Sequence, residues 1–136
     1  GKPGDLPPSK VWYLKRRGYI NGRRGSYRLL PRGMKALSER EIWELTIPIP
    51  RQWDHKWHLV LFDIPADKRK RRDSFRLRLK ELGLQLYQNS VWIYPYPLEE
   101  TVRKVAAFYK ISGCVYFITA EKISKEQVFQ SRFNLK

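Results

Sequence analysis

The stretch WHLVLF at residues 57–62 decides the fold, because it is apolar almost throughout and is closed by DIP at residues 63–65. So short an apolar run that ends at a turn signal is typical of a strand buried in the middle of a sheet. The sequence therefore predicts a central strand here, with Asp63 at its carboxyl end.

The elements after this strand predict the fold class. Residues 67–82 carry apolar side chains at helical spacing, with Asp67 expected as the N-cap and Gly83 as the stop. Further elements are predicted at 84–87 (strand), 90–95 (strand), 98–109 (helix) and 114–119 (strand). Strand, helix, strand, strand, helix, strand is the order of a ferredoxin-like βαββαβ domain, which belongs to the α+β class.

The residues before this domain predict a smaller segment. Residues 9–17 form a short helical pattern, and a hairpin follows whose glycine-bounded tip carries Arg23 and Arg24. A second helical pattern covers residues 34–45, and the prolines after it forbid its continuation. We therefore expect four parts: residues 1–45, a linker at 46–56, the ferredoxin-like domain at 57–123 and a C-terminal tail at 124–136.

The composition indicates an anionic partner. The chain has 136 residues, and 42% of them are hydrophobic, so it is expected to fold around a core. Residues 1–50 hold 11 basic and 4 acidic side chains (+7), and residues 51–136 hold 17 and 9 (+8), which together give +15. Ribosomal or membrane-surface binding would give the same imbalance, but the aromatic content and the strand-like runs favour a globular nucleic-acid-binding protein.

The sequence also predicts where the protein works. No apolar stretch approaches the roughly 20 residues that a membrane span needs, and no signal peptide is visible. Cys114 is the one cysteine of the sequence, so an intrachain disulfide framework is excluded. We expect a cytoplasmic protein without a membrane partner. Because the sequence opens on Gly1 and its one methionine is Met34, we also expect further residues upstream.

The densest positive feature is the run Lys68-Arg69-Lys70-Arg71-Arg72, which Arg76, Arg78 and Lys80 continue along the same predicted helix. Like charges in a run repel one another, and a polyanion offsets that cost, although a solvated helix face is the alternative interpretation. The hairpin tip, preceded by the basic end of the first helix, suits a wing that inserts along a groove; an ordinary solvated turn is its alternative. The predicted nucleic-acid-binding residues are Arg16, Arg17, Arg23, Arg24, Lys68, Arg69, Arg71, Arg72 and Arg76.

Asp63 is the candidate for catalysis and for metal binding, since it stands where a buried strand ends. One carboxylate holds Mg²⁺ weakly, so Asp63 would need Asp67, Asp73 or the Asp63 of a two-fold partner. The alternative is structural: an aspartate before Ile-Pro caps the following turn and neutralises nearby arginines. No zinc motif, catalytic triad or phosphate-binding glycine loop is visible in the sequence.

Several of these stretches together resemble two related families. LVLFDIP at 59–65, the basic residues at 68–72, Leu82-Gly83 and QNSVW at 88–92 resemble the CRISPR-associated Cas-two type of protein. They equally resemble the central domain of the PaaX, or phenylacetate-repressor, family, which shares that fold. The resemblance covers about residues 55–123.

The two resemblances imply different functions. In the Cas-two type, Asp63 from both subunits of a dimer would bind a divalent metal for cutting nucleic acid, while other members bind DNA without it. In PaaX, a winged-helix module precedes the domain of a dimeric transcription repressor. LKRRGYI at 14–20, YRL at 27–29 and Gly33 resemble the recognition-helix end and the wing of such a module, and Trp92 with Tyr94-Pro95 resembles the repressor version of the motif.

Three functional hypotheses follow. The favoured one is a PaaX-like homodimeric DNA-binding regulator that grips duplex phosphates and needs no cofactor for binding. The enzyme hypothesis is an endonuclease that uses paired Asp63 carboxylates with Mg²⁺ or Mn²⁺. The third is a non-catalytic dimeric subunit of a CRISPR integrase complex. Double-stranded DNA is the expected partner, and RNA stays open.

Overall fold

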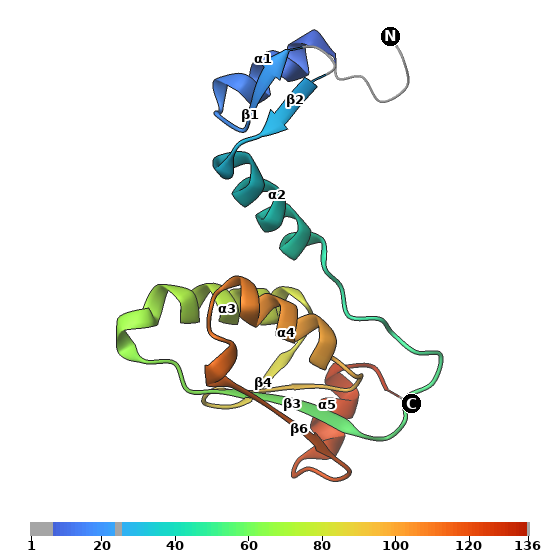
Figure 1. Cartoon of the computed structure of the whole chain (residues 1–136). Coiled ribbons are helices and arrows are strands. Elements are labelled where there is room, and N and C mark those ends of the chain that lie inside the picture. The colour runs from blue at the N-terminus through green and yellow to red at the C-terminus, as the bar shows by residue number, and fades with distance from the viewer. Residues whose placement is uncertain (1–6, 24–25, 136) are drawn as a thin grey trace. The chain divides into compact units, whose positions relative to one another are not determined.

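The computed structural model of the chain describes residues 7–23 and 26–135. The chain divides into two compact units, residues 1–44 and residues 45–136 (Figure 1). Within the described residues, no helix is long and apolar enough to span a membrane.

The second unit is built on a four-stranded antiparallel sheet. Its strands are β3 (Trp57–Phe62), β4 (Gln85–Gln88), β5 (Val91–Tyr94) and β6 (Val115–Ala120). They lie in the order β4-β5-β3-β6, so the apolar strand β3 has a neighbour on both sides. The prediction of a ferredoxin-like α+β domain is confirmed, and its predicted central strand is central.

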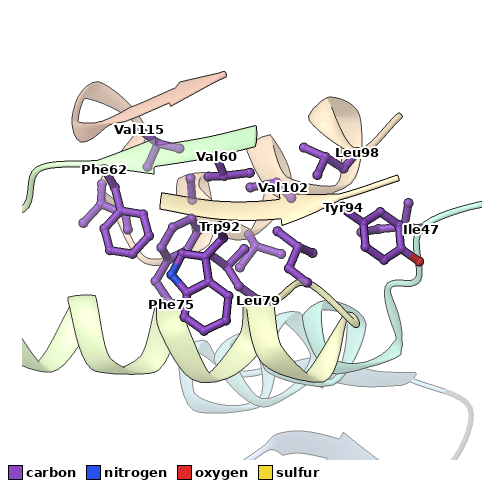
Figure 2. Packing of buried hydrophobic residues seen from close by; sticks show 14 residues of the cluster. Ile47, Val60, Phe62, Phe75, Leu79, Trp92, Tyr94, Leu98, Val102 and Val115 are labelled. Carbon is purple, nitrogen blue, oxygen red and sulfur yellow. The ribbon is translucent and has the colours of Figure 1, made fainter. Parts of the chain in front are cut away.

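Two helices cover one face of this sheet. They are α3 (Arg69–Glu81) and α4 (Glu99–Phe108); the short 3₁₀ turns η1 (Ala66–Lys68) and η2 (Ser112–Cys114) precede α3 and β6. Side chains alternate along a strand, and Val60 and Phe62 of β3 accordingly join the core cluster that contains the helices (Figure 2). The Phe62 and Phe75 rings meet edge to face, with their centroids 5.3 Å apart. Burying each such side chain stabilises the fold by about 1.5–3 kcal/mol.

The other face of the sheet is partly covered by α5 (Glu126–Arg132). Phe129 of this helix is buried against Trp57, and their ring centroids lie 6.4 Å apart. The indole Nε1 of Trp57 donates a hydrogen bond to Glu126 Oε1 at 2.8 Å. Residues 124–136, which the sequence analysis assigns to a tail, therefore contain a helix that packs on the sheet.

Residues 45–47 belong to the second unit. The carbonyl oxygen of Leu45 accepts a hydrogen bond from Arg78 Nη2 at 2.5 Å, and that of Thr46 accepts one from Thr101 Oγ1 at 3.2 Å. Ile47 is buried in the main core cluster. The start of the segment that the sequence analysis assigns to a linker is thus held by α3 and α4.

The first unit consists of α1 (Pro8–Arg16), the hairpin β1 (Ile20–Arg23) and β2 (Ser26–Leu29), and α2 (Pro31–Glu44). Gly33 allows a close approach between two segments of this unit. A Cβ atom at Gly33 would lie 2.1 Å from the carbonyl oxygen of Tyr19, so only glycine lets the first turn of α2 approach the chain before β1.

The predicted N-cap of α3 is wrong. Asp67 does not cap the helix, because it lies inside η1, where the Lys68 N–H donates to the Pro65 carbonyl at 2.9 Å. The N-cap position of α3 falls instead on Lys68, whose side chain makes no capping hydrogen bond in the described structure.

Candidate nucleic-acid interface

The amino end of α3 concentrates positive charge where a helix tolerates it least. Five consecutive basic residues, Lys68, Arg69, Lys70, Arg71 and Arg72, occupy its N-cap and first turn, and no acidic residue lies in that turn. The helix dipole already places partial positive charge there, and the first backbone N–H groups lack partners within the helix. We call these five residues the basic end of α3. Together they form a strong electrostatic attractor for phosphate.

The basic end is accessible to a ligand. Arg69, Lys70 and Arg71 are exposed, while Lys68 and Arg72 are half-buried. Asp67 and four of the basic side chains line a surface hollow of about 540 Å³. Arg72 pairs with its neighbour Asp73 at 3.2 Å. An anion seated in this hollow would meet several guanidinium and ammonium groups at once.

Farther along α3 the basic residues separate into two roles. Arg76 is exposed, as expected of a nucleic-acid-binding residue. Arg78 is only 4% exposed and donates to the carbonyl oxygen of Leu45. The expectation that Arg78 continues the basic surface is therefore wrong, because the turn of the helix points its side chain into the unit.

The first unit carries a second basic surface. Arg16, Arg17 and Arg23 are exposed, whereas Arg24, the other predicted residue of the hairpin tip, lies outside the described residues. Lys15 lies over the ring of Tyr27, with Nζ 5.7 Å from the ring centroid. The surface therefore spans the end of α1 and the hairpin, two parts of one compact unit.

Two aromatic residues that the sequence analysis did not select lie among these arginines. Arg16 Cζ lies 5.0 Å from the ring centroid of Trp12, and Arg17 Cζ lies 5.3 Å from that of Tyr13. Each aromatic residue precedes its arginine by four positions, which is the spacing of neighbours on a helix surface. That spacing in WYLKRR at residues 12–17 is the signal by which the pairs could have been found.

Asp63 lies where the sequence places it, directly after β3, and its side chain is exposed. Its backbone N–H donates to the Cys114 carbonyl at 3.0 Å, which ties the end of β3 to the start of β6. Among the described residues, no group of three or more His, Cys, Asp or Glu side chains could hold a metal ion.

The two histidines and the cysteine take no part in either basic surface. His58 is half-buried in β3, and burial is the main factor that lowers the pKa of its imidazole; Lys56 lowers it further, while Asp54 raises it. His58 Nε2 is enclosed and has no hydrogen-bond partner among the described residues. His55 is exposed in the loop before β3, and Cys114 is half-buried at the end of η2.

The geometry of both surfaces suits binding to a polyanion. The groups that would meet a ligand are guanidinium and ammonium donors, which form charge-assisted hydrogen bonds to phosphate oxygens.

Comparison with known proteins agrees with the fold. Residues 50–131, more than half of the chain, match the family described as the PaaX protein central Cas2-like domain. The match spans the whole sheet, α3, α4 and most of α5. A search of curated proteins gives no match. The resemblance to PaaX is confirmed, and the chain belongs to the family of the PaaX central Cas2-like domain.

Proposed function

We propose that the chain is a PaaX-like, DNA-binding transcription regulator of the cytoplasm that grips the phosphates of duplex DNA. The observation that carries this proposal is the basic end of α3, where five cations stand at the positive end of a helix dipole. Each cation in that position is unfavourable by a few tenths of a kcal/mol to about 1 kcal/mol. A bound phosphate backbone offsets that cost, because its negative charge attracts both the cations and the amino end of the helix, so the arrangement favours the bound state.

The basic surface of the first unit supports a duplex as the ligand. A short helix that ends in two arginines and is followed by a two-stranded hairpin resembles the recognition-helix end and wing of a winged-helix module. In such a module the helix approaches a groove and the wing lies along the backbone. Arg16, Arg17, Arg23 and Arg24 would then contact the duplex from this unit, and Lys68, Arg69, Arg71, Arg72 and Arg76 from the other.

The sheet supports a homodimer. On β6, the edge strand of the sheet, Tyr116 is 60% and Ile118 is 49% exposed. Both belong to the face on which α5 packs, since β6 alternates and Val115 and Phe117 join the opposite cluster. Exposed apolar side chains on an edge strand favour association with another chain. A second copy of this chain would cover Tyr116 and Ile118 in a two-fold dimer.

Duplex binding tests the proposal. With a labelled duplex of mixed sequence, the affinity of the wild-type chain should fall steeply as the salt concentration rises. The variant Arg71→Ala/Arg72→Ala should bind more weakly, with the slope of log K against log salt smaller by about 2. The matched control is Arg103→Ala/Lys104→Ala, which removes the same charge from α4, where both cations already pair with Glu99 and Glu100. Equal losses of duplex affinity in the two variants would mean that net charge alone controls binding, and would contradict the proposal.

A cleavage assay distinguishes a DNA-binding protein from a nuclease. Duplex and single strands are incubated with Mg²⁺, Mn²⁺ or EDTA, with the wild type and with Asp63→Ala. The proposal expects binding in every arm, no cleavage, and the same affinity for Asp63→Ala. Metal-dependent cleavage that Asp63→Ala abolishes would establish the endonuclease instead.

The dimer has its own test. Ile118→Lys places a charge on the open sheet face and should shift the sedimentation coefficient from that of a dimer to that of a monomer. Leu77→Lys is the control, because Leu77 is similarly exposed, at 50%, but lies on α3. A wild-type chain that sediments as a monomer at all concentrations would refute the dimer.

A further inference from the structure

Trp12 and Tyr13 are large aromatic residues that α1 leaves in solvent. They are 61% and 44% exposed, and no residue of α1 is buried. Half-buried Val11 and Leu14 of the same helix lie on its opposite side, as expected from 100° per residue. The two aromatic rings therefore contribute little to a core within the described residues of this unit.

Each ring instead supports an arginine. The Cζ–centroid distances of 5.0 Å for Arg16 on Trp12 and 5.3 Å for Arg17 on Tyr13 are those of cation–π pairs. The four side chains line one surface hollow of about 410 Å³. An arginine held over a ring loses much of its freedom before it meets a ligand, and the N–H edge of its planar guanidinium stays available for a bidentate contact.

The charge of α1 indicates an anionic ligand. Between Pro8 and Arg17 the chain carries Lys10, Lys15, Arg16 and Arg17 and no acidic residue, so the hollow is complementary to an anion. Acceptor pairs that match a guanidinium edge are found along a phosphate backbone.

We propose that Trp12 and Tyr13 are positioning residues that preorganise Arg16 and Arg17 for contacts with the phosphates of duplex DNA. This rests on the proposed function, and it adds two residues that act through their arginines and not by touching bases. Preorganisation raises affinity because less side-chain freedom is lost on binding.

A double-mutant cycle tests the proposal in the full chain, by fluorescence anisotropy with a labelled duplex of mixed sequence at fixed salt. Trp12→Leu should weaken binding about two- to fivefold, the range expected when an exposed cation–π pair is lost. In the Arg16→Ala background, Trp12→Leu should have no further effect. Trp12→Phe should retain most of the affinity, and Arg16→Lys should not, because an ammonium has no planar edge. The same cycle applies to Tyr13 and Arg17.

A similarly exposed tryptophan of this unit provides the control. Trp43, 50% exposed on α2, should tolerate the change to leucine without loss of affinity. Additive effects of Trp12→Leu and Arg16→Ala would overturn the proposal, because the ring would then contact the nucleic acid or fold the unit by itself. Preference for single strands that depends on Trp12 in both backgrounds would overturn it in favour of base stacking. If the wild-type chain binds no duplex, the proposed function falls as well; if it binds and the cycle is additive, only this inference falls.

Discussion

Arg76 and Arg78 show how two residues of one type diverge within a single helix. Both belong to the basic sequence of α3, but Arg76 is exposed, whereas Arg78 is buried and donates to the carbonyl of Leu45. Deleting one partner of a buried hydrogen bond lowers the stability of the protein more than deleting an exposed side chain does.

Substitution of these arginines should separate stability from binding. We expect Arg78→Ala to lower the free energy of unfolding by about 1–3 kcal/mol, because the interaction with Leu45 is lost and a cavity remains. Arg76→Ala should change stability by less than about 0.5 kcal/mol and should weaken duplex binding. Urea unfolding and anisotropy measure the two effects. The reverse pattern, with Arg76→Ala the less stable variant, would contradict the structure.

His58 should give the protein a pH-dependent stability. Burial lowers its pKa in the folded state, so the unfolded chain binds a proton more readily than the folded one does. The folded state is therefore fully stable above the unfolded pKa of about 6.5 and is destabilised as the pH falls below it. His58→Gln should flatten the dependence of the unfolding free energy on pH between about 7 and 5, as measured by urea unfolding at a series of pH values.

At the scale of the element, the cations proposed to bind phosphate lie at the end of α3 where they destabilise the helix. Cations at the amino end of a helix oppose its dipole, whereas cations at the carboxyl end complement it. The helix has both: Arg69 and Lys70 stand in its first turn, and Arg78 and Lys80 stand in its last.

Charge reversal at the two ends of α3 should therefore have opposite effects. Lys70→Glu should raise the free energy of unfolding by about 0.3–1 kcal/mol at low salt and should weaken duplex binding. Lys80→Glu, which has the same change in charge at the other end, should lower it. Thermal unfolding at low and high salt checks both signs, and the difference should shrink as salt screens the dipole. Equal shifts in both variants would mean that net charge alone controls stability.

At the scale of the whole molecule, burial is distributed unevenly between the two units. The two hydrophobic core clusters draw their residues from the unit that begins at Leu45. In the described part of the first unit, only Gly33 and Ile42, both on α2, are buried. Segments with few buried apolar contacts open at low free energy.

Hydrogen exchange should reveal this difference. Backbone amides of β3, which has a strand on either side, should exchange only on global unfolding of their unit. Amides of the β1–β2 hairpin should exchange orders of magnitude faster. A fragment of residues 45–136 should keep the protection of β3, because the two clusters are contained in it. Equal protection of both sheets would show that the first unit is stabilised as strongly as the second.

The sequence by itself predicted the parts whose pattern is local. The apolar run at 57–62, the helical spacing after it and the order of elements were enough for the ferredoxin-like α+β fold, and element bounds fell close to those observed. Local patterns also predicted the exposed basic residues on α3, because their density is visible without knowing the fold. The function of these residues remains a prediction.

Tertiary structure decided what depends on long-range contacts. The sequence predicts a tail at residues 124–136, because α5 is too short to be recognised from its own pattern. This helix is stabilised by packing on Trp57, which lies 69 positions before its hydrogen-bond partner Glu126. The sequence predicts Arg78 as a surface cation. Its partner, the Leu45 carbonyl, lies 33 positions away and is brought to it only by the fold. Composition and periodicity determined which elements form, and burial and pairing between distant residues determined which charges remain on the surface for a ligand.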